Sequence, residues 1–136
     1  MDTDFVNAFA RHFDDAELLF NHQRFANASQ LYGLAAECGL KAMMTKFDMP
    51  LSSNSPQDKK DRVHADGVWQ RYESYRSGHI SGAAYGLTTQ NPFSQWSVNQ
   101  RYWKTSCITQ QDVLMHQQGA TLVKNLVTKA QLAGLL

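Results

Sequence analysis

The 136-residue chain has little cysteine, no long apolar run and few acidic residues in its second half. Its two cysteines, Cys38 and Cys107, do not form a Cys-x-x-Cys pair, so the sequence predicts neither a zinc site nor a redox site. No segment approaches the roughly 20 apolar residues of a membrane-spanning helix. The first twenty residues are charged and lack the apolar core of a signal peptide. We therefore expect a cytoplasmic protein without metal, cofactor or membrane contact.

Charge is divided unevenly along the chain. Residues 1–66 carry ten acidic and seven basic side chains, whereas residues 67–136 carry two acidic and six basic ones. A basic second half fits a negatively charged partner. It also fits mutual neutralisation of the two halves, within the fold or across a dimer. Neutralisation is the simpler interpretation, because the excess is small beside that of a dedicated nucleic-acid-binding protein.

Apolar periodicity predicts one domain over residues 1–136, built from four long helices. We expect these helices over residues 2–23, 24–47 and 58–76 and from residue 109 onward. The second is apolar around most of its circumference and rich in alanine, as in a helix buried among others. Thr109 and Asp112 have the spacing of a capping box, which marks the start of the last helix.

The connections between these helices differ in character. Residues 48–58 contain two prolines and three serines, which predicts a surface loop. The glycine-rich residues 77–86 predict a turn or short helix. Residues 87–107 lack a helical period, and we expect an extended arm that lays its aromatic rings onto the bundle, namely Phe93, Trp96, Tyr102 and Trp103. The expected fold is an all-α, up-and-down bundle of four long helices with a short helix and an irregular, aromatic-rich crossover.

Two segments carry a family resemblance. Asp-Ala-Glu-Leu-Leu-Phe at residues 15–20 ends the first helix, and residues 24–42 combine a tyrosine, an Ala-Ala-Glu step and a Leu-Lys step. This short-linked helix pair resembles the HEPN domain family. The resemblance implies a helical bundle that often forms homodimers and is frequently encoded beside nucleotidyltransferases or in toxin–antitoxin and defence systems. It therefore implies a homodimer whose partners include RNA, a nucleotide or a nucleotidyltransferase-type protein.

Many HEPN proteins are metal-independent ribonucleases that use an arginine, four to six arbitrary residues and a histidine. This chain departs from that motif: seven residues separate Arg71 from His79, and two separate Arg76 from His79. On a straight helix the longer spacing leaves the two side chains about 80° apart around the axis. Gly78 argues against a straight helix there, so convergence stays open. Arg71 or Arg76 with His79 are accordingly the candidate catalytic residues of a divergent ribonuclease.

Two further groups are candidates for ligand binding. Glu37 and Lys41 lie four residues apart in the buried helix, either as a solvated ion pair or as a partly buried pair within a site. Arg101, Tyr102 and Lys104 alternate basic and aromatic character, which suits single-stranded RNA. The aromatic residues fit equally well as core beneath the arm, and Arg101 would pin the arm if it paired with Glu37.

The leading functional hypothesis is a HEPN-like domain that lacks the usual nuclease motif. Such a domain would bind RNA, a nucleotide or a protein partner in a stress, defence or toxin–antitoxin context. The alternatives are the divergent ribonuclease and a structural or antitoxin-type interaction subunit.

Overall fold

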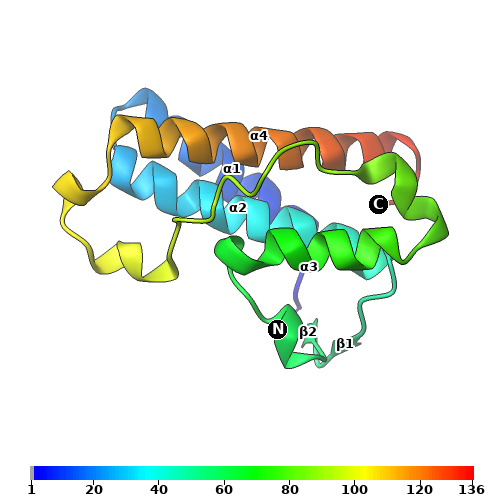
Figure 1. The fold of residues 1–136 in the computed structure, drawn as a ribbon. Helices are drawn as coiled ribbons and strands as arrows, with labels where there is room; N and C mark the ends of the chain where they lie inside the picture. The colour runs from blue at the N-terminus through cyan, green and yellow to red at the C-terminus, as the bar shows by residue number, and fades with distance from the viewer. Residues whose placement is uncertain (1) are drawn as a thin grey trace.

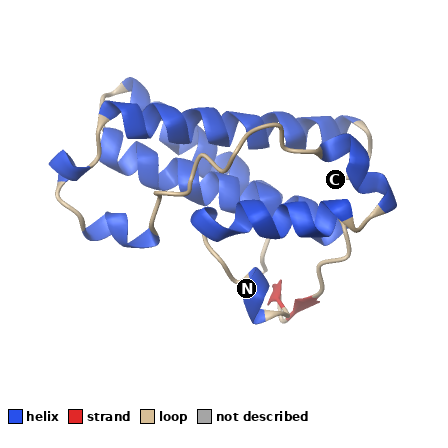
Figure 2. Cartoon of the chain, viewed as in Figure 1, coloured by secondary structure: helices blue, strands red, loops and turns tan. Residues whose placement is uncertain are grey.

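A computed structural model describes residues 2–136 and confirms the all-α fold (Figures 1 and 2). The long helices are α1 (Phe5–Asn21), α2 (Phe25–Lys46), α3 (Ala65–Ser77) and α4 (Gln110–Leu132). Short 3₁₀ helices are η1 (Lys59–Asp61), η2 (Ile80–Tyr85), η3 (Val98–Tyr102) and η4 (Thr105–Cys107). A two-stranded antiparallel hairpin joins β1 (Leu51–Ser52) to β2 (Ser55–Pro56). Within residues 2–136, no helix combines the length and the apolar character needed to cross a membrane.

The centre of the molecule is α2, as its composition predicts. Helices α1, α3 and α4 all pack against it (Figure 1). Small residues let these neighbours approach closely: Gly39 lies against Val123 of α4 and Phe9 of α1. Larger side chains, including Tyr32 and Met43, are fully buried. Burial of this apolar area, at about 25 cal/mol per Å², is the main force that holds the bundle together.

Helices α1 and α4 follow their predicted stripes. The Asp4 side chain caps α1 by accepting a hydrogen bond from the Asn7 N–H group. Thr109 and Asp112 form the predicted capping box of α4. The predicted inner face of α4 is buried throughout, from Val113 to Ala130. Periodicity and capping therefore locate both helices to within a few residues.

The third helix begins seven residues later than predicted. The predicted span from residue 58 is broken, because Asp58 caps the short η1 helix through the Lys60 N–H group. The chain then turns so that the Asp61 carboxylate is fully buried. Extended backbone at His64 precedes the first residue of α3. A buried carboxylate, rather than the helical pattern, thus decides where α3 starts.

The crossover is only partly the covering arm that the sequence predicts. Phe93 and Trp96 are buried against the bundle as expected. The expected packing of Tyr102 and Trp103 is wrong, because these rings are 76% and 46% exposed. Residues 98–107, here called the distal arm, begin against the first half of α2 and then run out past the end of the bundle (yellow in Figure 1).

Gly33 allows the indole of Trp96 to lie directly on α2, since a Cβ atom at position 33 would overlap the ring. Replacing Gly33 with alanine should therefore lower the free energy of unfolding by about 1–3 kcal/mol, measured by urea denaturation. Gly78→Ala is the matched control, because its Cβ would meet only ordinary contacts. Equal stability of the two variants would contradict the close approach.

Candidate functional site

The distal arm presents two exposed aromatic rings flanked by basic side chains. The guanidinium carbon of Arg101 lies 4.6 Å from the centroid of the Tyr102 ring, in the geometry of a cation–π contact. Trp103 and Lys104 follow, and both are exposed. Single exposed apolar side chains are common on protein surfaces, but large aromatic side chains exposed together on one segment usually mark an interaction site.

Hydrogen bonds from the base of the arm to Ser29 of α2 hold the arm in place. The indole N–H of Trp96 donates to the Ser29 carbonyl oxygen over 3.1 Å. The Gln100 amide donates to the Ser29 hydroxyl over 3.0 Å. Ser97 forms a capping box with Gln100 at the start of η3. The arm is therefore anchored at its base while its tip stays in solvent.

His116 of α4 completes this buried joint. Its Nδ1 atom lies 2.7 Å from the Ser29 hydroxyl, and its ring stacks on Phe93 with centroids 5.4 Å apart. Because the Gln100 Nε2 atom can only donate, the hydroxyl accepts from Nε2 of Gln100 and donates to Nδ1 of His116, which places the imidazole proton on Nε2 of His116. Burial lowers the pKa of His116 to about 4. The ring is therefore neutral at pH 7.

A cavity of about 220 Å³ lies between the arm and the start of α2. It is lined by Gln23, Arg24, Phe25, Ala26, Asn27 and Thr105. The first-turn N–H groups of α2 have no acceptor within their helix, and the Arg24 side chain does not cap them. Thr105 brings η4 to the same cavity, so the arm and the positive end of α2 form one continuous surface.

Glu37 and Lys41 form the ion pair that their spacing predicts, with Nζ and Oε1 2.7 Å apart. Both side chains are largely buried, at 14% and 9% exposure, so the pair is not a solvated surface bridge. Glu37 also meets His64, whose Nδ1 lies 3.1 Å from the second carboxylate oxygen. Sequence reasoning missed His64, because 27 positions separate it from Glu37 and only the turn before α3 brings it there.

Arg101 does not form the contact with Glu37 that would have pinned the arm. The Arg101 guanidinium instead donates to the carbonyl oxygen of Val98 over 2.9 Å, within its own short helix. The base of the arm docks at Ser29, eight residues before Glu37 in α2. The two predicted ligand-binding groups therefore form separate sites on the same helix.

Arg71 is engaged by a buried carboxylate. Its Nε and Nη2 atoms lie 2.8 Å and 2.6 Å from one oxygen of Asp61. The Tyr75 hydroxyl donates to the other oxygen over 2.6 Å. This hydrogen bonding raises the pKa of Arg71 above its ordinary value. The observed role of Arg71 is to hold η1 against α3.

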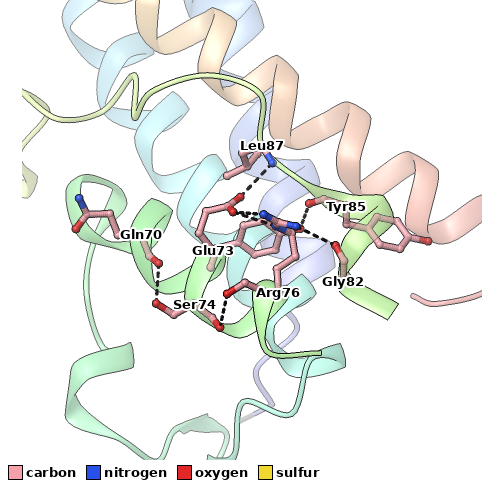
Figure 3. A network of polar contacts seen from close by, with 9 residues as sticks. Gln70, Glu73, Ser74, Arg76, Gly82, Tyr85 and Leu87 are labelled. Carbon is pink, nitrogen blue, oxygen red and sulfur yellow. Dashed lines mark hydrogen bonds and ion pairs between the residues drawn. The ribbon is translucent and has the colours of Figure 1, made fainter. Parts of the chain in front are cut away.

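Arg76 belongs to a different network, which fastens the η2 segment to α3 (Figure 3). Its guanidinium is paired with Glu73 and also donates to the Gly82 carbonyl oxygen over 3.4 Å. Glu73 in turn accepts a hydrogen bond from the Leu87 N–H group. The Tyr72 hydroxyl donates to the Tyr85 carbonyl oxygen. The middle and the C-terminal end of η2, together with Leu87 just beyond it, are thereby tied to one turn of α3.

His79 uses both ring nitrogens in local contacts. Its Nδ1 accepts a hydrogen bond from the Ser81 N–H group, and its Nε2 lies 3.4 Å from Asp48. The ring also packs on Phe47. The structure thus gives Arg71, Arg76 and His79 separate partners and does not bring them together around one cavity.

Comparison with protein-family models, curated proteins and solved structures gave no match to this chain. In the part of the chain that the structure describes, no group of three or more His, Cys, Asp or Glu side chains has a metal-binding arrangement. The functional argument therefore depends on the geometry of the arm and of the polar groups along α2.

The contacts of Asp61 make a prediction about Arg71. Asp61→Asn should lower the free energy of unfolding by about 2 kcal/mol. The substitution replaces the buried carboxylate by a neutral amide, so the Arg71 guanidinium loses its charged partner. Urea denaturation measures the loss, and the exposed Asp66→Asn is the matched control. If Asp61→Asn were as stable as the wild type, the ion pair between Asp61 and Arg71 would not stabilise the fold, which would contradict the structural role of Arg71.

His116 predicts a pH dependence of stability. The unfolded chain takes up a proton near pH 6.5, whereas the folded ring does so only near pH 4, because burial outweighs the opposing charge of Asp112. Stability should therefore fall by about 3 kcal/mol as the pH drops from 6.5 to 4. Urea denaturation of the wild type and His116→Gln across this range isolates the effect. Parallel pH profiles would contradict it.

Proposed function

We propose that this chain is a HEPN-like domain that binds single-stranded RNA through its distal arm. The observation that supports this most directly is the exposure of Tyr102 and Trp103 on a segment whose base is firmly anchored. Unpaired bases stack on such rings while cationic side chains meet the phosphates. Arg101 and Lys104 supply those cations on the same segment.

The anchoring of the arm favours a binding role over accidental exposure. A flexible loop would lose much of its conformational entropy on binding, which weakens affinity. Here Trp96 and Gln100 fix the base of the arm through buried hydrogen bonds. The aromatic rings are therefore held in solvent before any ligand arrives. Such preorganisation is typical of a recognition surface.

Charge around the arm also favours an anionic ligand. The chain has no acidic residue between Glu73 and Asp112. Arg24 and the first residues of α2 line the adjoining cavity, and the Arg24 side chain does not cap this helix. A phosphate beside the stacked bases would meet these donors and the positive end of the helix dipole.

The other two hypotheses receive less support from the geometry. A ribonuclease that uses Arg71 or Arg76 with His79 stays a prediction, and those side chains already have separate structural partners. Exposed tyrosine and tryptophan side chains also suit the interface of an antitoxin-type subunit, but the lack of acidic residues between Glu73 and Asp112 favours a polyanionic ligand. The arm therefore favours the RNA-binding hypothesis.

The arm predicts a specific pattern of RNA affinities. Tyr102→Ala and Trp103→Ala should each weaken binding of a labelled single-stranded oligonucleotide by about 1–3 kcal/mol, because each removes a stacking surface. Lys104→Gln should reduce the slope of log affinity against log salt by about 0.7, the value for one phosphate contact on a single strand. Fluorescence anisotropy at several salt concentrations measures both quantities.

Ile80→Ala is the matched control, because Ile80 is 96% exposed but lies outside the arm. It should leave the affinity unchanged. A duplex of the same sequence should bind more weakly, since its bases are already stacked. Undiminished binding by both aromatic variants, or no salt-dependent binding by the wild type, would refute the proposal.

A further inference from the structure

A second polar centre lies on α2, away from the arm, and His64 is its exposed member. The His64 side chain is 48% exposed, and its Nδ1 lies 3.1 Å from the Glu37 carboxylate. A carboxylate oxygen accepts here, so the Nδ1–H group is the donor, and in the neutral ring the lone pair is on Nε2. No contact occupies Nε2 within residues 2–136. This tautomer makes Nε2 the nucleophilic atom of the ring.

Lys41 adjusts the charge of this centre. Its ammonium group lies 2.7 Å from Glu37, so the carboxylate that orients His64 is also neutralised. An anionic reagent that approaches Nε2 therefore does not meet an isolated negative charge. A largely buried ion pair usually stabilises a fold less than apolar residues of similar size would. The Glu37–Lys41 ion pair in the most buried helix is therefore better explained by its contact with His64, whose imidazole ring it orients.

The position of His64 in the fold also suits an anionic product. His64 is the N-cap residue of the 13-residue helix α3, and its side chain makes no capping hydrogen bond. A negative group on the ring would lie beside the positive end of that helix. Asp66 in the first turn is exposed to solvent, which screens its opposing charge.

The other four histidines lack this combination. His116 is buried, and the half-buried His12 forms no hydrogen bond or ion pair with a carboxylate in residues 2–136. His79 has both nitrogens in contacts. His22 is exposed but has no carboxylate contact among the residues that the structure describes. His22 is therefore the natural internal control for His64.

We propose that His64 is a phosphoryl-acceptor site, which takes a phosphoryl group on Nε2 from a high-energy donor of the phosphoramidate class. The Nε2 lone pair forms the new N–P bond, and the P–N bond of the donor breaks. The donor nitrogen reacts in its protonated form, so it takes the electron pair of the P–N bond and departs as neutral ammonia. The ring, which keeps its Nδ1 proton, becomes an Nε2-phosphorylated imidazolium beside the Glu37 carboxylate. The Nδ1 proton stays in its hydrogen bond to Glu37, and nothing is oxidised or reduced. This site is independent of RNA binding by the arm.

Phosphoramidate itself tests the proposal on the full chain. Labelling followed by peptide mapping gives the rate at each histidine, and NMR identifies the phosphorylated nitrogen. His64 should react on the order of tenfold faster than His22, because its tautomer is fixed and its Nε2 is free. In the urea-unfolded chain the two should react alike. Glu37→Gln should bring the rate at His64 down to that at His22.

The wild-type comparison of His64 with His22 needs no variant, so it stands even where Glu37→Gln fails to fold. Lys41→Met provides a second variant and should also slow His64. Equal rates at His64 and His22 in the folded wild type would overturn the proposal. Phosphorylation at Nδ1, or an unchanged rate in a folded Glu37→Gln variant, would overturn it as well.

Discussion

The close contact between Trp96 and Gly33 is the constraint on which the arm depends. Without a side chain at position 33, the indole reaches the surface of α2 and donates to the Ser29 carbonyl oxygen. This fixes the direction in which the chain leaves the bundle. Beyond Gln100 the chain has no core to cover, and the side chains of Tyr102 and Trp103 stay in solvent. One small residue in a buried helix thus determines where a surface site is displayed.

Local pattern was sufficient to predict most of the scaffold. Helices α1, α2 and α4 follow apolar periodicity, and the Thr109–Asp112 capping box marks a helix start in both sequence and structure. The start of α3 was not predictable in this way. It depends on burial of Asp61 against Arg71, ten positions later. Such a contact has no periodic signature, and the residues around it have ordinary helical character.

The candidate sites were predictable to the extent that they are local. The Glu37–Lys41 pair follows from i, i+4 spacing, whereas His64 joins it only through the tertiary fold. Exposure of Tyr102 and Trp103 was not predictable either, because aromatic residues between polar ones fit a core arm and a surface arm equally well. The buried joint of Ser29 with His116 links positions 87 apart, and no sequence pattern connects them.

The polar centre at Ser29 and the polar centre at Glu37 are built in the same way. Helix α2 contributes Ser29 to one centre and the Glu37–Lys41 ion pair to the other. Ser29 and Glu37 lie about 12 Å apart along the helix axis. Each group is met by residues from an irregular segment, the base of the arm in one case and the turn before α3 in the other. A polar side chain in so apolar a helix is stable only where such a partner satisfies it. The rigid helix therefore sets where the centres lie, while the connecting segments decide what each exposes to solvent, as is usual when loops on a scaffold carry function.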